Sequence, residues 1–375
     1  MSAEPIAPAL EETQEVPRFE TPAVAPPSGW ALPITRGQLL ALAGLILLAL
    51  VPIPFGTYGF YVGAYALVYV MIGLSVTVVT GYAGLISLMP YSFAGVGGLI
   101  TGMAMASWGW PFWLCIPLAA VATVPISILV GVISVRLKGL YLAIATLTIA
   151  AMLGETFFTW SSVRNADVGW VVNRPTPFVG DRVFYVLCLA AALILVFMIE
   201  GLRTSKLGRA MLAVRDNERE AEALGINVMQ TKLAAFVIGG MMAGVGGAFL
   251  ALLLQNIGGI GVTVFQSPQV DAVSIILVSL VVVGGIDRAW GAFFGAIVLV
   301  VQRQVFNGAE FFFSFVGIYS ALLLITFLLF RPGGLLQIGK LQLQLIKERP
   351  AFGSAVVAGI LGLNLGVAWL FVKLS

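Results

Sequence analysis

The chain has 375 residues, of which 60% are hydrophobic and 10% charged, and its formal net charge is +3. Soluble domains carry about 25% charged residues, so this composition excludes an ordinary soluble enzyme and indicates a protein that lies in lipid. Histidine, the commonest general base and metal ligand, is absent, and both cysteines, Cys115 and Cys188, lie inside apolar runs.

In chain order, residues 1–30 come first and are rich in Pro, Ala and Glu, which predicts a disordered acidic tail. Apolar runs of about 20 residues, the length of a transmembrane helix, then follow one another to the C-terminus. They span 37–55, 58–80, 84–106, 111–135, 139–160, 183–202, 232–254, 270–286, 289–306, 311–330 and 351–372. The expected fold class is an all-α polytopic membrane protein with about ten transmembrane or half-transmembrane helices and one extra C-terminal helix, 351–372.

Two of these runs are irregular. The run 84–106 contains Pro90 followed by a cluster of glycines, which predicts broken backbone over Ser87–Phe93. At membrane depth such backbone is tolerated where it is buried in protein or lines a cavity. The run 270–286 is short and starts with Asp271, so we expect a half-helix or a tilted helix. Pairs such as Gly240 and Gly244 predict close helix contacts inside the bundle.

Lysine and arginine placement predicts the orientation. If the N-terminus is cytoplasmic and every run crosses once, 15 of these residues fall in inside segments and 5 in outside segments. The stretch 161–182 is then an outside loop, and the highly charged stretch 203–231 is an inside loop.

The inside loop contains a predicted helix. Asp216, Asn217 and Glu218 are suited to capping its start, and Gly225 is suited to ending it. A helix of two to three turns is marginal in water, so the bundle or a partner must hold it.

The run SKLGRAMLAVRDNEREAEALGINVMQTKLAAFVIGGMMAGVGGAF, residues 205–249, resembles the coupling loop and following helix of branched-chain amino-acid ABC transporter permeases of the LivM type. Glu220–Gly225 is similar to the EAA motif that docks import permeases on an ATPase, although Glu222 stands where the motif has its second Ala. Further segments similar to this family are Gly84–Gly97, Arg136–Ala143, Val283–Gly295 and Arg331–Leu335. The resemblance covers about 37–336, the expected permease domain.

The resemblance implies that ATPase coupling involves Arg215, Asp216, Asn217, Glu218, Glu220, Ala221, Glu222 and Gly225. It implies a bacterial or archaeal inner membrane location. It also implies three kinds of protein partner: a second, LivH-type permease, two ABC ATPases and an extracytoplasmic solute-binding protein. The chain is further expected to contact membrane lipid and to bind no nucleic acid. No phosphate-binding loop occurs in the sequence, so this chain is expected to be non-catalytic and to hold no cofactor, with ATP–Mg bound by the ATPases.

Mildly polar residues in the runs, together with the broken segment, are candidates for the translocation path: Thr80, Ser87, Pro90, Ser92, Phe93, Thr146, Thr148 and Ser274. The alternative is that these hydroxyls bond the backbone of their own helix. Branched-chain or other hydrophobic amino acids are the expected solutes, with urea, amides and small organic acids as alternatives. A stand-alone secondary transporter is the rival function, and it would have no need of the helix at 216–225.

Overall fold

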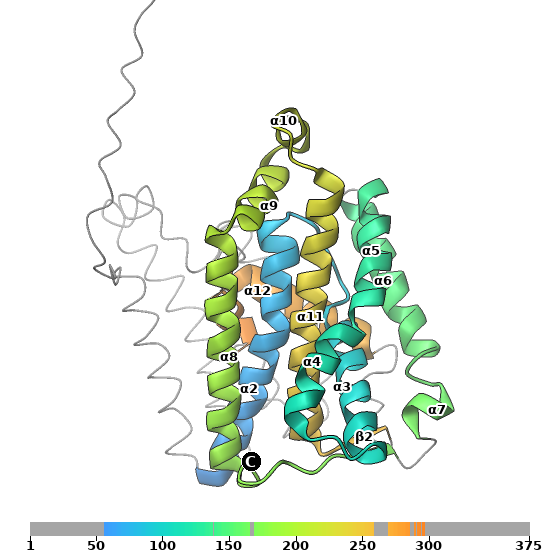
Figure 1. Ribbon diagram of the computed structural model, residues 1–375, viewed down its shortest axis with the longest axis vertical. Coiled ribbons are helices and arrows are strands. Elements are labelled where there is room, and N and C mark those ends of the chain that lie inside the picture. Colours follow the sequence, from blue (N-terminus) through green and yellow to red (C-terminus); the bar gives the residue numbers. More distant parts are fainter. Residues whose placement is uncertain are drawn as a thin grey trace, which may run out of the picture. The chain divides into compact units, whose positions relative to one another are not determined.

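The computed structural model describes residues 56–137, 139–165, 169–258, 269–285, 289, 291–293 and 295–296. Its elements are helices and one pair of short strands (Figure 1). In chain order they are α2 (Gly56–Val76), the π-helix η2 (Thr77–Tyr82), α3 (Pro90–Ser107), α4 (Phe112–Ala122), α5 (Val124–Arg136), α6 (Leu140–Glu155), α7 (Ser161–Arg164), β1 (Gly169–Val171), α8 (Asp181–Thr204), α9 (Lys206–Asp216), α10 (Glu218–Ala223), α11 (Val228–Leu254), β2 (Asn256–Gly258) and α12 (Gln269–Gly285).

Four helical stretches in the described part are long and apolar enough to cross a membrane: Gly56–Tyr82, Phe112–Arg136, Asp181–Thr204 and Val228–Leu254. A helical membrane protein is therefore confirmed. The total of about ten spans stays a prediction, because the tail 1–30 and the runs 37–55, 311–330 and 351–372 lie outside the described residues, as does part of 289–306.

The central helix of the described bundle is α11, which contacts α2, α3, α4 and α5 (Figure 1). Glycines bring its backbone against those of its neighbours. A Cβ added to Gly97 of α3 would lie 2.6 Å from the Cα of Gly244, and one added to Gly244 would lie 2.7 Å from the carbonyl oxygen of Ala119 on α4. The predicted close packing at Gly240 and Gly244 is confirmed, since a Cβ added to Gly240 would lie 2.0 Å from the side-chain Oγ of Ser127 on α5.

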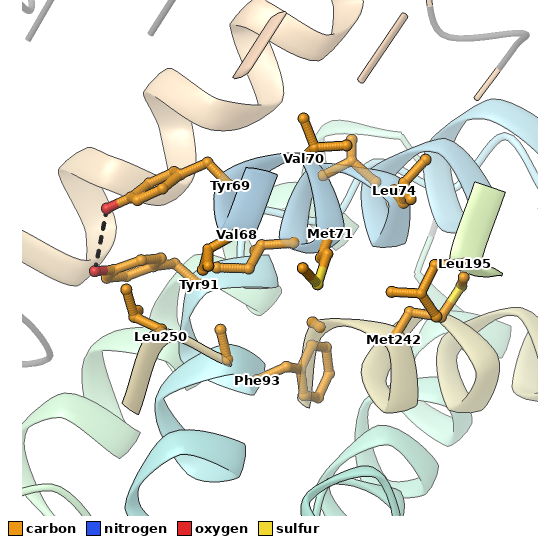
Figure 2. Close-up of a cluster of buried hydrophobic side chains, with 14 of the residues drawn as sticks. Val68, Tyr69, Val70, Met71, Leu74, Tyr91, Phe93, Leu195, Met242 and Leu250 are labelled. Atoms are coloured by element: carbon orange, nitrogen blue, oxygen red, sulfur yellow. Dashed lines mark hydrogen bonds between the residues drawn. The ribbon is translucent and has the colours of Figure 1, made fainter. Parts of the chain in front are cut away.

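Large apolar side chains fill the space between α2, α3, α8 and α11 (Figure 2). The Tyr69 hydroxyl of α2 donates to the Tyr91 hydroxyl of α3 over 3.3 Å, which satisfies a polar group in this apolar cluster. Burial divides the helices into two kinds. The apolar window of α2 is 83% buried, whereas that of α8 is 39% buried and leaves Phe197 and Met198 exposed. Such an outward apolar face suits contact with lipid.

Several element boundaries differ from the predictions. The run 111–135 forms two helices that meet at Thr123, because Pro125 in the first turn of α5 cannot continue the hydrogen bonding of α4. The run 84–106 becomes helical at Pro90, so Pro90 starts α3 instead of interrupting a helix. Residues 83–89 before it are not helical, and the π-helix η2 before them was not predicted.

A two-stranded pair lies at the opposite end of the bundle from α10 (Figure 1). Strands β1 and β2 are antiparallel, with Trp170 opposite Ile257. Arg174 follows β1 and is buried; it donates to the carbonyl oxygen of Leu252 over 3.3 Å and forms an ion pair of 2.6 Å with Asp181 at the start of α8. This arginine therefore fastens the predicted outside loop 161–182 to the ends of α8 and α11.

Candidate functional site

Helices α9 and α10 stand at the end of the bundle where α11 begins (Figure 1). α9 was not predicted. Its start is capped by Ser205, whose hydroxyl oxygen accepts from the backbone N–H of Gly208 over 3.1 Å. It buries Gly208, Met211 and Val214 and turns its charged residues outward, so it is an amphipathic helix lying on the bundle.

The residues that cap α10 are among those that the sequence predicts. Its N-cap is Asn217, whose side-chain oxygen accepts from the N–H of Arg219 over 3.1 Å and whose amide donates to Glu220 over 2.6 Å. Gly225 ends the helix with φ +81°. The N–H of Gly225 bonds to the carbonyl of Glu222 over 2.9 Å, and that of Ile226 to the carbonyl of Ala221 over 3.0 Å. These two bonds form a Schellman motif, so α10 is only six residues long, shorter than the predicted two to three turns.

A small apolar cluster and an ion pair hold α10 on the bundle. Val214 of α9, Ala221 of α10 and Val228 of α11 form a hydrophobic cluster separate from the main core. Beside it, the Nζ of Lys232 on α11 lies 2.7 Å from the Oε1 of Glu218. The structure thus supplies within this chain the support that a helix this short requires.

A second contact joins α9 to the end of α2. The guanidinium of Arg215 donates to the carbonyl oxygen of Gly81 in η2. Gly84, with φ +69°, allows this close approach, since a Cβ there would lie 2.8 Å from the Cγ of Arg215. Between residues 83–85 and 214–219 lies an open pocket of about 340 Å³.

The eight predicted coupling residues divide into two groups. Asp216, Asn217, Glu220, Glu222 and Gly225 are exposed, and this surface is open to another protein. Arg215, although also exposed, and the half-buried Glu218 contact this chain's own helices, and Ala221 is 1% exposed, so it packs inward.

Sequence reasoning missed two residues here. Leu224, at the tip between α10 and Gly225, is a large apolar side chain that is 79% exposed. The signal for it was an apolar residue directly before the helix-ending glycine, in a charged segment. Lys232 was counted only as a charge that sets orientation, and nothing local in the sequence pairs it with Glu218.

Part of the predicted translocation path comes together in space. Ser87, Pro90 and Phe93 line a narrow cavity of about 10 Å³ whose other walls include Ser75 and Gly239. This places the broken backbone before α3 against α2 and α11.

Thr146 and Thr148 of α6 face different surroundings. The Thr146 hydroxyl is buried, donates to the carbonyl of Ala143 over 2.9 Å and accepts from the N–H of Leu88 over 3.0 Å. Thr148 is exposed and donates to the carbonyl of Ile144 over 3.0 Å. Both hydroxyls thus bond their own helix, as the alternative interpretation expects, and Thr146 also anchors the broken segment.

The hydroxyl oxygens of Thr80, Ser92 and Ser274 are buried and have no hydrogen-bond partner in the described part of the chain, and the same holds for Thr77 in η2. Burying an unpaired hydroxyl costs about 1–3 kcal/mol, so each such group needs an explanation. A role in the path stays a prediction for all of the candidate residues.

The fold and the site define a helical membrane protein that presents a short, firmly held helix at one end. The sequence profile of the branched-chain amino acid transport system permease component family matches residues 59–330. The chain belongs to this family.

Its curated relatives include the high-affinity branched-chain amino acid transport system permease protein LivM of Escherichia coli, 29% identical over 83% of this chain and 78% of that protein. The LivM protein of Salmonella typhimurium is 26% identical over the same shares. A probable branched-chain amino acid transport permease protein LivH of Methanocaldococcus jannaschii is 24% identical over 72% of this chain and 88% of that protein. No solved structure matches the chain.

Proposed function

We propose that this chain is the permease subunit of an ATP-driven importer of branched-chain or other hydrophobic amino acids. The observation that carries the proposal is α10, a capped helix whose outer side is exposed and whose inner side is fixed to α9 and α11. Membership of the permease family and the similarity to the LivM proteins support the choice of solute.

The exposed rim of α10 docks on an ATPase subunit. Leu224 is the apolar anchor, because a large apolar side chain that is 79% exposed is suited to burial in a partner's pocket. Asp216, Asn217, Glu220 and Glu222 surround it as a polar rim, and Gly225 sets the angle at which the tip leaves the helix. The ATPases bind ATP–Mg and supply the rigid-body movement that switches the bundle between its inward and outward states.

The end that carries α9 and α10 faces the cytoplasm of the expected inner membrane, and the N-terminus lies on the same side, since the run 37–55 is predicted to cross the membrane once. The distribution of basic residues supports this orientation, because they are concentrated on and beside α9, including Lys206, Arg209 and Arg215. The opposite end carries the exposed aromatic residues Trp108, Trp110, Trp113 and Trp160, which suit a membrane–water interface on either side.

Other parts of the assembly follow from the family. The similarity to a protein named LivH supports pairing with a second, homologous permease. An extracytoplasmic solute-binding protein delivers the solute to the end with the β1–β2 pair. Residues 37–336 form the permease domain with its coupling loop at 203–231, the acidic tail 1–30 lies in the cytoplasm, and 351–372 adds a further transmembrane helix.

Co-purification tests this proposal. Leu224→Asp should abolish recovery of the ATPases with the permease, because it places a charge in the apolar docking contact. Val171→Asp is the matched control: Val171 is apolar and 57% exposed but lies at the opposite end of the bundle, so the ATPases should be recovered as with the wild type. Normal ATPase recovery and transport with Leu224→Asp would contradict docking through α10.

Transport into proteoliposomes tests the solute and the energy source. Uptake of radiolabelled leucine by the reconstituted complex should require ATP and the binding protein, and competition with urea, amides and small organic acids tests the alternative solutes. ATP-independent uptake by this chain alone would show a secondary transporter instead.

A further inference from the structure

Lys232 is a fully buried lysine, 2% exposed, in the second turn of α11. Its Nζ lies 2.7 Å from the Oε1 of Glu218, the first residue of α10. A lysine ammonium removed from water needs a charged or strongly polar partner, and the Glu218 carboxylate is such a partner. The pair therefore joins the proposed docking helix directly to the central helix of the bundle.

α10 is small, and the ion pair supplements a small apolar contact. The helix has six residues, and a cluster of three buried side chains, one from each of α9, α10 and α11, lies beneath it with Ala213 and Ile226 packed against the cluster. Residues 224–227 between α10 and α11 include Gly225 at φ +81°. The ion pair spans this turn, so it resists a pivot of α10 against α11 when α10 is pushed.

α9, which only Asn217 separates from α10, reaches the π-helix η2 at the end of α2 through the bond from Arg215 to the Gly81 carbonyl. α2 and α11 in turn lie close together, because a Cβ on Gly239 would come within 3.3 Å of the Ser75 carbonyl oxygen and one on Gly246 within 2.7 Å of Ile72. A displacement that enters α11 through Lys232 and α2 through Arg215 thus moves these two helices as one body.

We propose that Glu218 and Lys232 are positioning residues, whose ion pair carries the movement of α10 into α11, and that Glu218 faces Lys232 rather than the ATPase. This inference rests on the proposed function, since it takes α10 as the ATPase-docking helix. It assigns Glu218 a different role from Leu224 and the exposed acidic residues, and it adds Lys232 to the coupling machinery.

The experiment uses the whole complex in proteoliposomes and measures two quantities: ATPase recovery, and solute molecules transported per ATP hydrolysed. A loss of folded complexes lowers both rates together and leaves their ratio unchanged. Lys232→Met keeps the length and apolar stem of the side chain but removes the charge. We expect normal ATPase recovery and a transport-to-hydrolysis ratio lowered about tenfold, a typical size for coupling between sites.

The charge exchange Glu218→Lys with Lys232→Glu should restore at least half of the wild-type ratio, because the ion pair is reversed but present. Glu218→Lys alone should lower the ratio like Lys232→Met. Lys206→Met is the control, since Lys206 is an exposed lysine on α9 and its loss should leave the ratio unchanged. If the Lys232→Met protein does not accumulate, two other variants provide the test. Lys232→Arg keeps the ion pair and should keep the wild-type ratio, and the charge exchange should restore at least half of it.

Three results would overturn the proposal. The first is a wild-type transport-to-hydrolysis ratio with Lys232→Met, and the second is a charge-exchange protein that accumulates but does not restore this ratio. The third is a loss of ATPase recovery with Glu218→Lys that the charge exchange does not repair. The last result would assign Glu218 to the ATPase contact. Failure of the proposed function is separate, because the wild-type chain would then recover no ATPase at all.

Discussion

Replacement of Gly97 by alanine should destabilise the bundle at the crossing of α3 and α11. The new Cβ would lie 2.6 Å from the Cα of Gly244. Neither atom can rotate away, because one is a main-chain atom and the other is bonded directly to the main chain. Carbon atoms prefer separations of 3.5–4.0 Å, so the two helices must move apart by about 1 Å. Overpacking of this kind costs about 1–3 kcal/mol.

Gly201→Ala is the matched control for this substitution. Gly201 lies inside α8 with no atom within 4 Å of an added Cβ, so alanine there should be neutral or stabilise the helix by about 0.5–1 kcal/mol. Reversible unfolding of the purified protein in mixed detergent micelles, followed by tryptophan fluorescence, gives both free energies of unfolding. Equal stability of the Gly97→Ala and Gly201→Ala proteins would refute the claim that backbone contact limits this crossing.

Three further predictions concern the two ends of the bundle. Asn217→Ala removes the cap of α10 and its bond to Glu220, at a cost of about 1 kcal/mol in that helix. Titration of the reconstituted permease with ATPase should show weaker binding by this variant. Asn217→Asp should bind the ATPase nearly as well as the wild type, because aspartate also caps helices. Gly225→Ala places a side chain at φ +81°, a strain of about 1–2 kcal/mol; the same titration should show weakened ATPase binding, and Gly225→Asn should be milder because asparagine tolerates this conformation. Arg174→Gln breaks the buried ion pair with Asp181 and should lower the unfolding free energy by about 3 kcal/mol, with partial recovery when Asp181→Asn is added; full stability of the single variant would exclude a fastening role.

The long apolar runs were predicted best. The runs 183–202 and 232–254 correspond to α8 and α11, whose ends differ by a few residues from the prediction. The reason is that each run is long and apolar without a break, whereas the exact starts of the helices, at Asp181 for α8 and after the N-cap Asn227 for α11, were missed by two to four residues. The caps of α10 were predicted because Asn217 and Gly225 are residue types suited to helix ends.

Features that depend on distant parts of the chain could not be predicted. The β1–β2 pair joins Trp170 to Ile257, and the pairing of Lys232 with Glu218 depends on how the chain turns after α10. Three-residue strands carry no periodic pattern of their own. Pro90 was recognised as a break, but whether a proline starts a helix or interrupts one depends on the path of the residues before it.

The candidate site could be predicted as a segment but not residue by residue. The charged loop and its EAA-like pattern located α10, yet only the packing separates outward residues such as Glu220 and Glu222 from inward ones such as Ala221. For Ser92 and Ser274, the structure shows buried hydroxyls without a partner among the described residues, which composition alone could not reveal.

The backbone contact between α3 and α11 has a consequence for how this sequence can change over time. A larger residue in a protein core can usually be accommodated when its neighbour becomes smaller. At Gly97 the neighbour is Gly244, at Gly247 it is the main chain of Ala94, and no residue is smaller than glycine. A substitution at either glycine therefore has no compensating partner in the opposite helix, and we expect natural relatives to vary freely at Gly201 while keeping glycine at these crossings.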